Sequence, residues 1–126
     1  MSIKRANIII PPVWSGVFYN TARLLKYSLE ENGIKSDIRE ADDINNTDFS
    51  IVLGWNLMTK NISFKQPYII YQLEPLCLEH WRQNLNSRLS LFEHAFAIWD
   101  YSSQNQKYLE AYGLKSQVIP LGYHPK

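Results

Sequence analysis

The chain has 126 residues, of which 45% are apolar and 13% aromatic. That length predicts one domain, residues 1–126, with a core of its own, and the apolar fraction excludes a disordered chain. Thirteen basic and twelve acidic residues give a net charge of +1, which excludes the strongly basic surface that is typical of nucleic-acid binding.

Targeting and metal-binding signals are absent from the sequence. The N-terminal apolar run Ile8–Ile10 ends at a Pro-Pro pair and is too short for a signal peptide or a membrane span, so we expect a cytoplasmic protein. The single cysteine, Cys77, forms no disulfide within the chain and is expected to be a small buried apolar side chain. His80 and His94 lack neighbours at metal-ligand spacing, which predicts no metal site.

Short apolar runs alternate with amphipathic segments along the chain. This pattern is typical of an α/β fold, here a Rossmann-like, three-layer α/β/α arrangement with a mainly parallel sheet of about six strands. The second strand is polar and is expected near an edge of the sheet. In chain order, we expect strands at residues 7–10, 35–39, 49–55, 67–72, 95–99 and 117–120.

Helices are expected between these strands, and several residues mark their ends. Gly33 and Gly113 fit the position that ends a helix in the left-handed conformation. Pro75 fits the first position of a helix, and Ser103 with Gln106 has the pattern of a capping box. The expected helices cover residues 17–32, a segment from 74–75 through 85, 87–93 and 104–112.

In open parallel sheets, ligands bind at the carboxyl ends of the strands. Aromatic faces with hydrogen-bonding neighbours suit sugar rings, although Tyr and Trp that simply close the end of a sheet give the same pattern. The sequence leaves both interpretations open. Five strand exits combine an aromatic residue with a polar neighbour, namely Trp14–Gly16, Gly54–Asn56, Tyr71–Glu74, Trp99–Ser102 and Leu121–His124.

Glu74 is the one candidate for a general base. It follows a strand and stands at a predicted helix N-terminus, where the helix dipole lowers the pKa of a carboxyl group. An ordinary charged residue near a helix N-cap has the same pattern. Gly16 alone is a weak signal for phosphate binding. The residues expected to contact a substrate are Trp14, Ser15, Gly16, Gln72, Asp100 and Ser102.

The second half of the chain resembles a known family. Residues 98–105 read IWDYSSQN, a predicted helix then ends at Gly113, and residues 118–123 read VIPLGY. This order is similar to the end of the N-terminal domain of GT-B glycosyltransferases of the family 1/4-like type, with W-D-Y-S after one strand and P-L-G-Y or P-x-G after the last. The Tyr71–Glu74 exit and the strand, loop and helix of residues 8–29 fit the same plan.

The resemblance implies an acceptor-binding domain for a saccharide or a glycolipid. In that family a second domain binds the nucleotide sugar, and the hexosyl or deoxyhexosyl group is transferred in the cleft between the two domains. The chain ends where that second domain is expected, and it lacks both the donor-domain E-x7-E pattern and a D-x-D metal motif. We therefore expect no cofactor bound by this chain alone, and no activity without a donor-binding domain in cis or in trans.

Two other functions remain open. A non-catalytic Rossmann-like interaction domain would form a homodimer or bind a protein partner through exposed aromatic residues. A flavodoxin-like nucleotide or flavin binder needs a phosphate loop after the first strand, and Trp14–Gly16 is poor for that. The position of an interface, at the carboxyl ends of the strands or elsewhere, discriminates between the acceptor-binding domain and the interaction domain.

Overall fold

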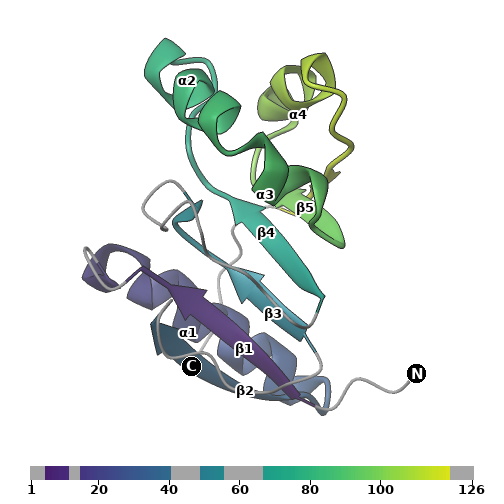
Figure 1. The fold of residues 1–126 in the computed structure, drawn as a ribbon. Coiled ribbons are helices and arrows are strands. Elements are labelled where there is room, and N and C mark those ends of the chain that lie inside the picture. The colour runs from purple at the N-terminus through teal and green to yellow at the C-terminus, as the bar shows by residue number, and fades with distance from the viewer. Residues whose placement is uncertain (1–4, 12–14, 41–48, 56–66, 120–126) are drawn as a thin grey trace.

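A single sheet of six parallel strands organises the computed structural model (Figure 1). The structure describes residues 5–11, 15–40, 49–55 and 67–119. The strands follow the spatial order β2-β1-β3-β4-β5-β6, which confirms the predicted α/β fold and places the polar second strand at an edge. Their bounds are β1 (Arg5–Ile10), β2 (Lys35–Glu40), β3 (Phe49–Val52), β4 (Tyr68–Gln72), β5 (Ala97–Asp100) and β6 (Gln117–Val118).

Helices cover the two faces of this sheet. Connections between parallel strands are right-handed, so the direction of each step along the sheet decides which face its helix covers. From β1 the chain steps outward to β2 through α1 (Ser15–Glu31), whereas β5 and β6 follow in the opposite direction. Helices α2 (Glu79–Ser87), α3 (Leu89–Glu93) and α4 (Ser103–Ala111) accordingly lie on the other face (Figure 1).

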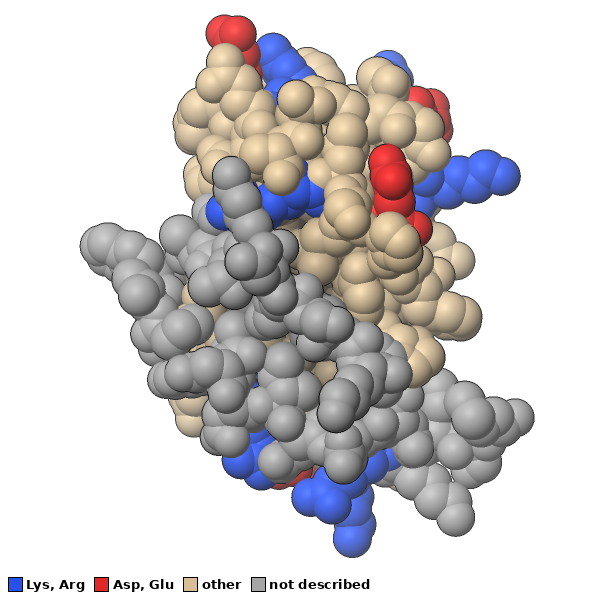
Figure 2. All heavy atoms as spheres, viewed as in Figure 1, with Lys and Arg blue, Asp and Glu red and all other residues tan. Residues whose placement is uncertain are grey.

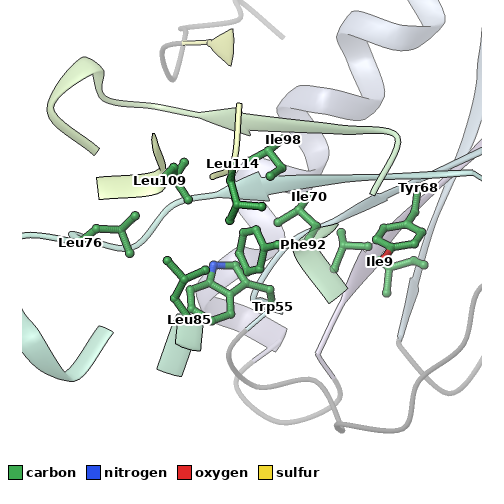
Figure 3. Close-up of a cluster of buried hydrophobic side chains, with 11 residues drawn as sticks. Ile9, Trp55, Tyr68, Ile70, Leu76, Leu85, Phe92, Ile98, Leu109 and Leu114 are labelled. Atoms are coloured by element: carbon green, nitrogen blue, oxygen red, sulfur yellow. The ribbon is translucent and has the colours of Figure 1, made fainter. Parts of the chain in front are cut away.

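Successive side chains of a strand point to opposite faces of the sheet, so the core consists of two clusters, one on each face. One cluster lies beneath α1, where Phe18 and Ala22 pack against buried strand side chains, among them Ile8 and Ile51. The other lies beneath the remaining helices and is drawn in Figure 3. Its buried members are Ile9, Val52, Trp55, Tyr68, Ile70, Leu76, Leu85, Phe92, Ile98, Leu109 and Leu114.

Two aromatic residues at strand exits belong to the core. Trp55 has no exposed surface and lies edge-on to Phe92, with their ring centroids 5.0 Å apart; Figure 3 shows both rings beside Leu85. Tyr71 is 2% exposed and packs edge-on against Trp99. At Trp55 and Tyr71 the structure therefore favours packing over contact with a sugar.

The helix ends at Gly33 and Gly113 are confirmed. Both glycines have positive φ angles, +80° and +76°. In each case the next residue closes the helix with a hydrogen bond to a carbonyl five residues back, Ile34 to Leu29 at 2.9 Å and Leu114 to Leu109 at 3.0 Å. This is the Schellman arrangement, which leaves fewer carbonyl groups of the last turn without partners.

The helix predicted to begin at Glu74 and Pro75 is wrong. The chain makes a turn there, closed by a hydrogen bond from Leu78 to the Pro75 carbonyl, and α2 begins only at Glu79. Side-chain amides from elsewhere in the fold hold the intervening backbone, as described below. Cys77 lies in this turn and is exposed, so its predicted burial is also wrong.

Three smaller boundaries differ from the predictions. The third strand ends at Val52, and the fifth begins at Ala97. Ser102, rather than Ser103, is the N-cap of α4, because the Ser102 hydroxyl accepts a hydrogen bond from the Gln104 amide at 3.2 Å. Both serines are good N-cap residues, and the sequence pattern alone did not separate them.

Replacement of Gly54 tests how closely the chain segments after β1 and β3 approach each other. Gly54 has a φ of +64°, and an added Cβ atom would lie 2.9 Å from Pro11 Cδ and 3.0 Å from Phe18 Cε2. Gly33 also has a positive φ, but nothing lies within 4 Å of its Cβ position. Gly33→Ala should cost about 1 kcal/mol through backbone strain, and Gly54→Ala about 1–3 kcal/mol more through the clash.

Urea unfolding of the two variants measures this difference. Equal losses of unfolding free energy in Gly54→Ala and Gly33→Ala would show that the segment after β3 is not packed against Pro11 as the structure places it.

Candidate functional site at the carboxyl ends of strands β4 and β5

Strands β4 and β5 are neighbours, and each ends on a buried polar residue. Gln72 and Asp100 are partners in the strand register, and neither side chain has exposed surface. The Gln72 Nε2 donates a hydrogen bond to Asp100 Oδ2 at 2.8 Å. The sequence predicted both residues as substrate contacts, and the structure places them side by side.

Asn105, in the first turn of α4, joins these two residues. Its Nδ2 donates to Asp100 Oδ1 and to the Glu74 carbonyl, each at 3.0 Å. Its Oδ1 accepts a hydrogen bond from the Leu76 amide at 3.1 Å. Asn105 is 3% exposed, so a buried side chain of α4 fixes the backbone that follows β4.

The Gln72 amide uses its full hydrogen-bonding capacity. Its Oε1 accepts from the Glu74 amide at 2.7 Å and from the Trp55 indole Nε1 at 3.3 Å. Besides Asp100, its Nε2 donates to the Glu74 carbonyl at 2.9 Å. We call Gln72, Asp100 and Asn105 the buried polar network.

Burial raises the pKa of Asp100, and the hydrogen bonds that its carboxylate accepts act in the opposite direction. Those bonds come from the side chains of Gln72 and Asn105 and from the amides of Tyr101 and Ser102, the last to Oδ1 at 2.9 Å. A buried carboxylate is costly unless its oxygens are bonded in this way. Within the fold, Asp100 therefore connects β4, β5 and the start of α4.

Glu74 stands at the edge of the buried polar network. Its amide donates a hydrogen bond to Gln72, and its carbonyl accepts hydrogen bonds from Gln72 and Asn105. Its side chain is half-buried. Among the residues that the structure describes, none donates a hydrogen bond to its carboxylate. The backbone position is fixed, and the carboxylate is free to accept a hydrogen bond or a proton from a bound molecule.

Burial raises the pKa of Glu74, and the positive charge that His80 can carry opposes this shift to a smaller extent. The predicted lowering of this pKa is wrong, because α2 begins five residues later, at Glu79, and places no helix N-terminus at Glu74. With no helix N-terminus beside Glu74, burial moves the pKa of its carboxyl group towards neutral pH, where a general base is most effective.

The remaining predicted site residues have different positions. Ser102 lies beside the buried polar network as the N-cap of α4. Ser15 and Gly16 form the start of α1, which begins two residues earlier than expected, and only their backbone is described. Trp14 lies outside the described residues. Contact of any of these residues with an acceptor stays a prediction.

Sequence reasoning missed Asn105, which makes three of the hydrogen bonds that organise this edge of the sheet. The one signal for Asn105 in the sequence is its spacing from Asp100. Asn105 follows Asp100 by five residues, which carries the chain across the helix N-cap and into the first turn of α4. A polar residue in a first helical turn ordinarily faces solvent, so no local pattern predicts the burial of Asn105.

The described part of the chain contains no group of three His, Cys, Asp or Glu side chains arranged to hold a metal ion. None of its helices is both long enough and apolar enough to cross a membrane. On the face that Figure 2 shows, blue and red side chains both occur among the described residues of the upper part. Among the described residues, this site is distinguished by two carboxyl groups whose pKa values are raised by burial and by the hydrogen bonds around them.

The fold and the site define a Rossmann-like domain with an all-parallel six-stranded sheet. Comparison with protein-family models, curated proteins and solved structures gave no match. The class of fold therefore stands on the topology alone, and the function must be argued from the residues at the strand ends.

Asn105→Ala should lower the unfolding free energy by about 2–3 kcal/mol. It removes three hydrogen bonds and leaves the buried Leu76 amide without its acceptor. Gln104→Ala is the matched control, since Gln104 is the preceding helical residue and is exposed; its cost should stay within about 0.5 kcal/mol. Chemical denaturation measures both, and a similar small effect of the two variants would contradict the network.

Glu74→Gln should change how stability depends on pH. A carboxyl group whose pKa is raised in the folded state binds protons more readily folded than unfolded, so its contribution to stability falls as pH rises through that window. As the pH rises above about 4, the ordinary pKa of a glutamate, the wild type should therefore lose stability relative to Glu74→Gln. Thermal unfolding measured from acidic to neutral pH, with Glu79→Gln as the control, checks the sign; a gain in the wild type would refute it.

Proposed function

We propose that this chain is the acceptor-binding domain of a GT-B-type sugar transferase and that it binds a saccharide or glycolipid hydroxyl beside Glu74. The observation that carries the proposal is the Glu74 carboxylate. It has no described hydrogen-bond donor, its pKa is raised by burial, and its backbone is fixed at the carboxyl end of a central strand. The resemblance of residues 98–123 to the family supports the same assignment.

In this proposal Glu74 is the general base. The carboxylate accepts the proton of the acceptor hydroxyl while the hydroxyl oxygen attacks the sugar carbon of the donor, and the nucleotide leaves with the bonding electrons. A raised pKa improves this proton transfer at neutral pH. The donor is a nucleotide sugar held by a donor-binding domain, in the same chain or in a partner chain.

The sheet topology supports a ligand at this edge. The strand order reverses between β1 and β3, and open α/β sheets bind ligands outside the carboxyl ends of their strands near such a reversal. Glu74 follows β4, the strand next to β3. The buried polar network then acts as a rigid support, because it fixes the backbone on both sides of the Glu74 side chain.

A non-catalytic interaction domain is the second candidate, and Phe96 is the observation that favours it. Its side chain is 77% exposed and directly precedes β5, so it lies at the amino edge of the sheet, opposite Glu74. An interface in this alternative would be centred on Phe96, because contact surfaces gather exposed apolar side chains. A homodimer or protein complex built on Phe96 would leave the Glu74 edge uncovered, which separates the two proposals by position.

An NMR titration of the chain tests the acceptor-binding proposal. Millimolar methyl glycosides of common hexoses and deoxyhexoses are added to the 15N-labelled protein. We expect shifts at the amides of Glu74, Leu76 and Ser102, and a loss of these shifts in Glu74→Gln but not in the control Glu79→Gln. Shifts confined to the surroundings of Phe96, or shifts that Glu74→Gln leaves intact, would contradict the proposal.

A further inference from the structure

A groove lies between helices α2 and α4, within the helical layer of the fold (Figure 1). Its volume is about 400 Å³, within the range of sites that hold small ligands. Neither Glu74 nor a member of the buried polar network lines it. The lining residues are Glu79, Arg82, Gln83, Asn86 and Tyr112.

The α2 wall of this groove is a polar stripe. Glu79, Gln83 and Asn86 are spaced by four and three residues, so their side chains share one face of the helix. All three are exposed, whereas Leu85, on another face of α2, is buried in the core. A helix rises about 1.5 Å per residue, so the stripe is about 10 Å long. This length suits an extended ligand better than a compact one.

Arg82 is oriented before any ligand arrives. Its Nη1 donates hydrogen bonds to the carbonyls of Leu76 and Cys77, each at 2.9 Å, and its guanidinium lies 5.1 Å from the Tyr108 ring centroid. Among the described residues, none accepts a hydrogen bond from its Nε or Nη2, so both remain donors for a ligand. Because the guanidinium is already held, binding a ligand there costs less side-chain entropy.

The other lining groups offer both donors and acceptors. No described residue bonds to the Asn86 side-chain amide. The Gln83 Nε2 makes a long hydrogen bond of 3.4 Å to Glu79 Oε1, which leaves Gln83 Oε1 as an acceptor. On the α4 side Tyr112 supplies an aromatic ring, and its hydroxyl donates to the Arg82 carbonyl at 3.4 Å. Sugar hydroxyls bond to such planar polar groups, and the C–H faces of sugar rings pack on an aromatic ring.

We propose that this groove binds a stretch of an uncharged, linear oligosaccharide. Hydroxyls of the sugar chain bond to the amides of Gln83 and Asn86 and to the Arg82 guanidinium, and one sugar ring packs against Tyr112. The formal charges of Glu79 and Arg82 cancel in the lining, which favours a neutral ligand over an ion. The inference does not rest on the Glu74 proposal, because the groove uses none of the side chains at that edge of the sheet.

Amide spectra of 15N-labelled Glu74→Gln test this inference, because that background removes the binding proposed at the carboxyl ends of the strands. Cellotetraose and maltotetraose at millimolar concentration are the probes. At least one of them should shift the amides of Gln83, Asn86 and Tyr112. Methyl glucoside at the same concentration should leave these amides unshifted, because a single ring fills only part of the groove. The affinity for the tetrasaccharide should change less than about twofold between low and high salt, as expected for an uncharged ligand.

Asn86→Ala in the same background should weaken tetrasaccharide binding by about three- to tenfold, the effect of losing one or two hydrogen bonds. Asn20→Ala is the matched control, since Asn20 is an exposed asparagine of helix α1, and it should leave the affinity unchanged. Both substitutions remove an exposed side chain from a helix, and circular dichroism verifies that both variants fold.

The inference is overturned if neither tetrasaccharide shifts the groove amides, if methyl glucoside shifts them equally, or if Asn86→Ala binds as tightly as Asn20→Ala. A steep loss of affinity with salt would also overturn it, since it would show that charge governs binding. Acetyl-tetraglycine amide serves as a second probe at the same concentration. Equal shifts with this peptide would overturn the inference in favour of a peptide main chain as the ligand.

Discussion

Asp100 has no exposed surface, and a carboxylate in that position destabilises a fold unless neighbouring groups replace the lost water. Here Gln72, Asn105 and the Ser102 amide supply those hydrogen bonds. Gln72 comes from the end of β4, whereas Ser102 and Asn105 come from the start of α4. Satisfying this one charge therefore fixes the end of β4, the end of β5 and the first turn of α4 relative to one another.

The same constraint determines the chain path beyond β4. Gln72 and Asn105 bond the backbone of Glu74, and Asn105 bonds the Leu76 amide. The side chains of Gln72 and Asn105 thus form hydrogen bonds with main-chain groups that would otherwise pair within a helix. Helix α2 accordingly starts only at Glu79. The exposed turn that contains Cys77 and the half-buried position of Glu74 both follow from this arrangement.

Patterning along the sequence predicted the architecture well, because it depends on local periodicity. Apolar runs located the strands, and the polar second strand was correctly expected at the edge. Gly33 and Gly113 marked two helix ends through a backbone preference that acts within a few residues. Gln72, Asp100 and Ser102 were also correctly expected at the carboxyl ends of strands, and the structure shows that those two strands are neighbours.

The errors arose where distant residues decide the local structure. Pro75 has the chemistry of a helix start, but Asn105, thirty residues later, holds the adjacent Leu76 in a turn. Trp55 follows a strand like a ligand-stacking residue, yet the packing of Phe92 and Leu85 buries it completely. The direction of the Glu74 pKa shift was wrong for the same reason, because it depended on a helix that begins elsewhere.

Native-state hydrogen exchange of three amides measures whether the buried polar network holds this edge of the sheet together. The amides of Glu74, Leu76 and Ser102 lie outside the strands and helices, yet they donate to Gln72, Asn105 and Asp100. If the buried polar network organises this edge, these amides should be nearly as protected as those of β4, with exchange limited by opening of the whole domain. Exchange at the rate of an open loop would contradict the account.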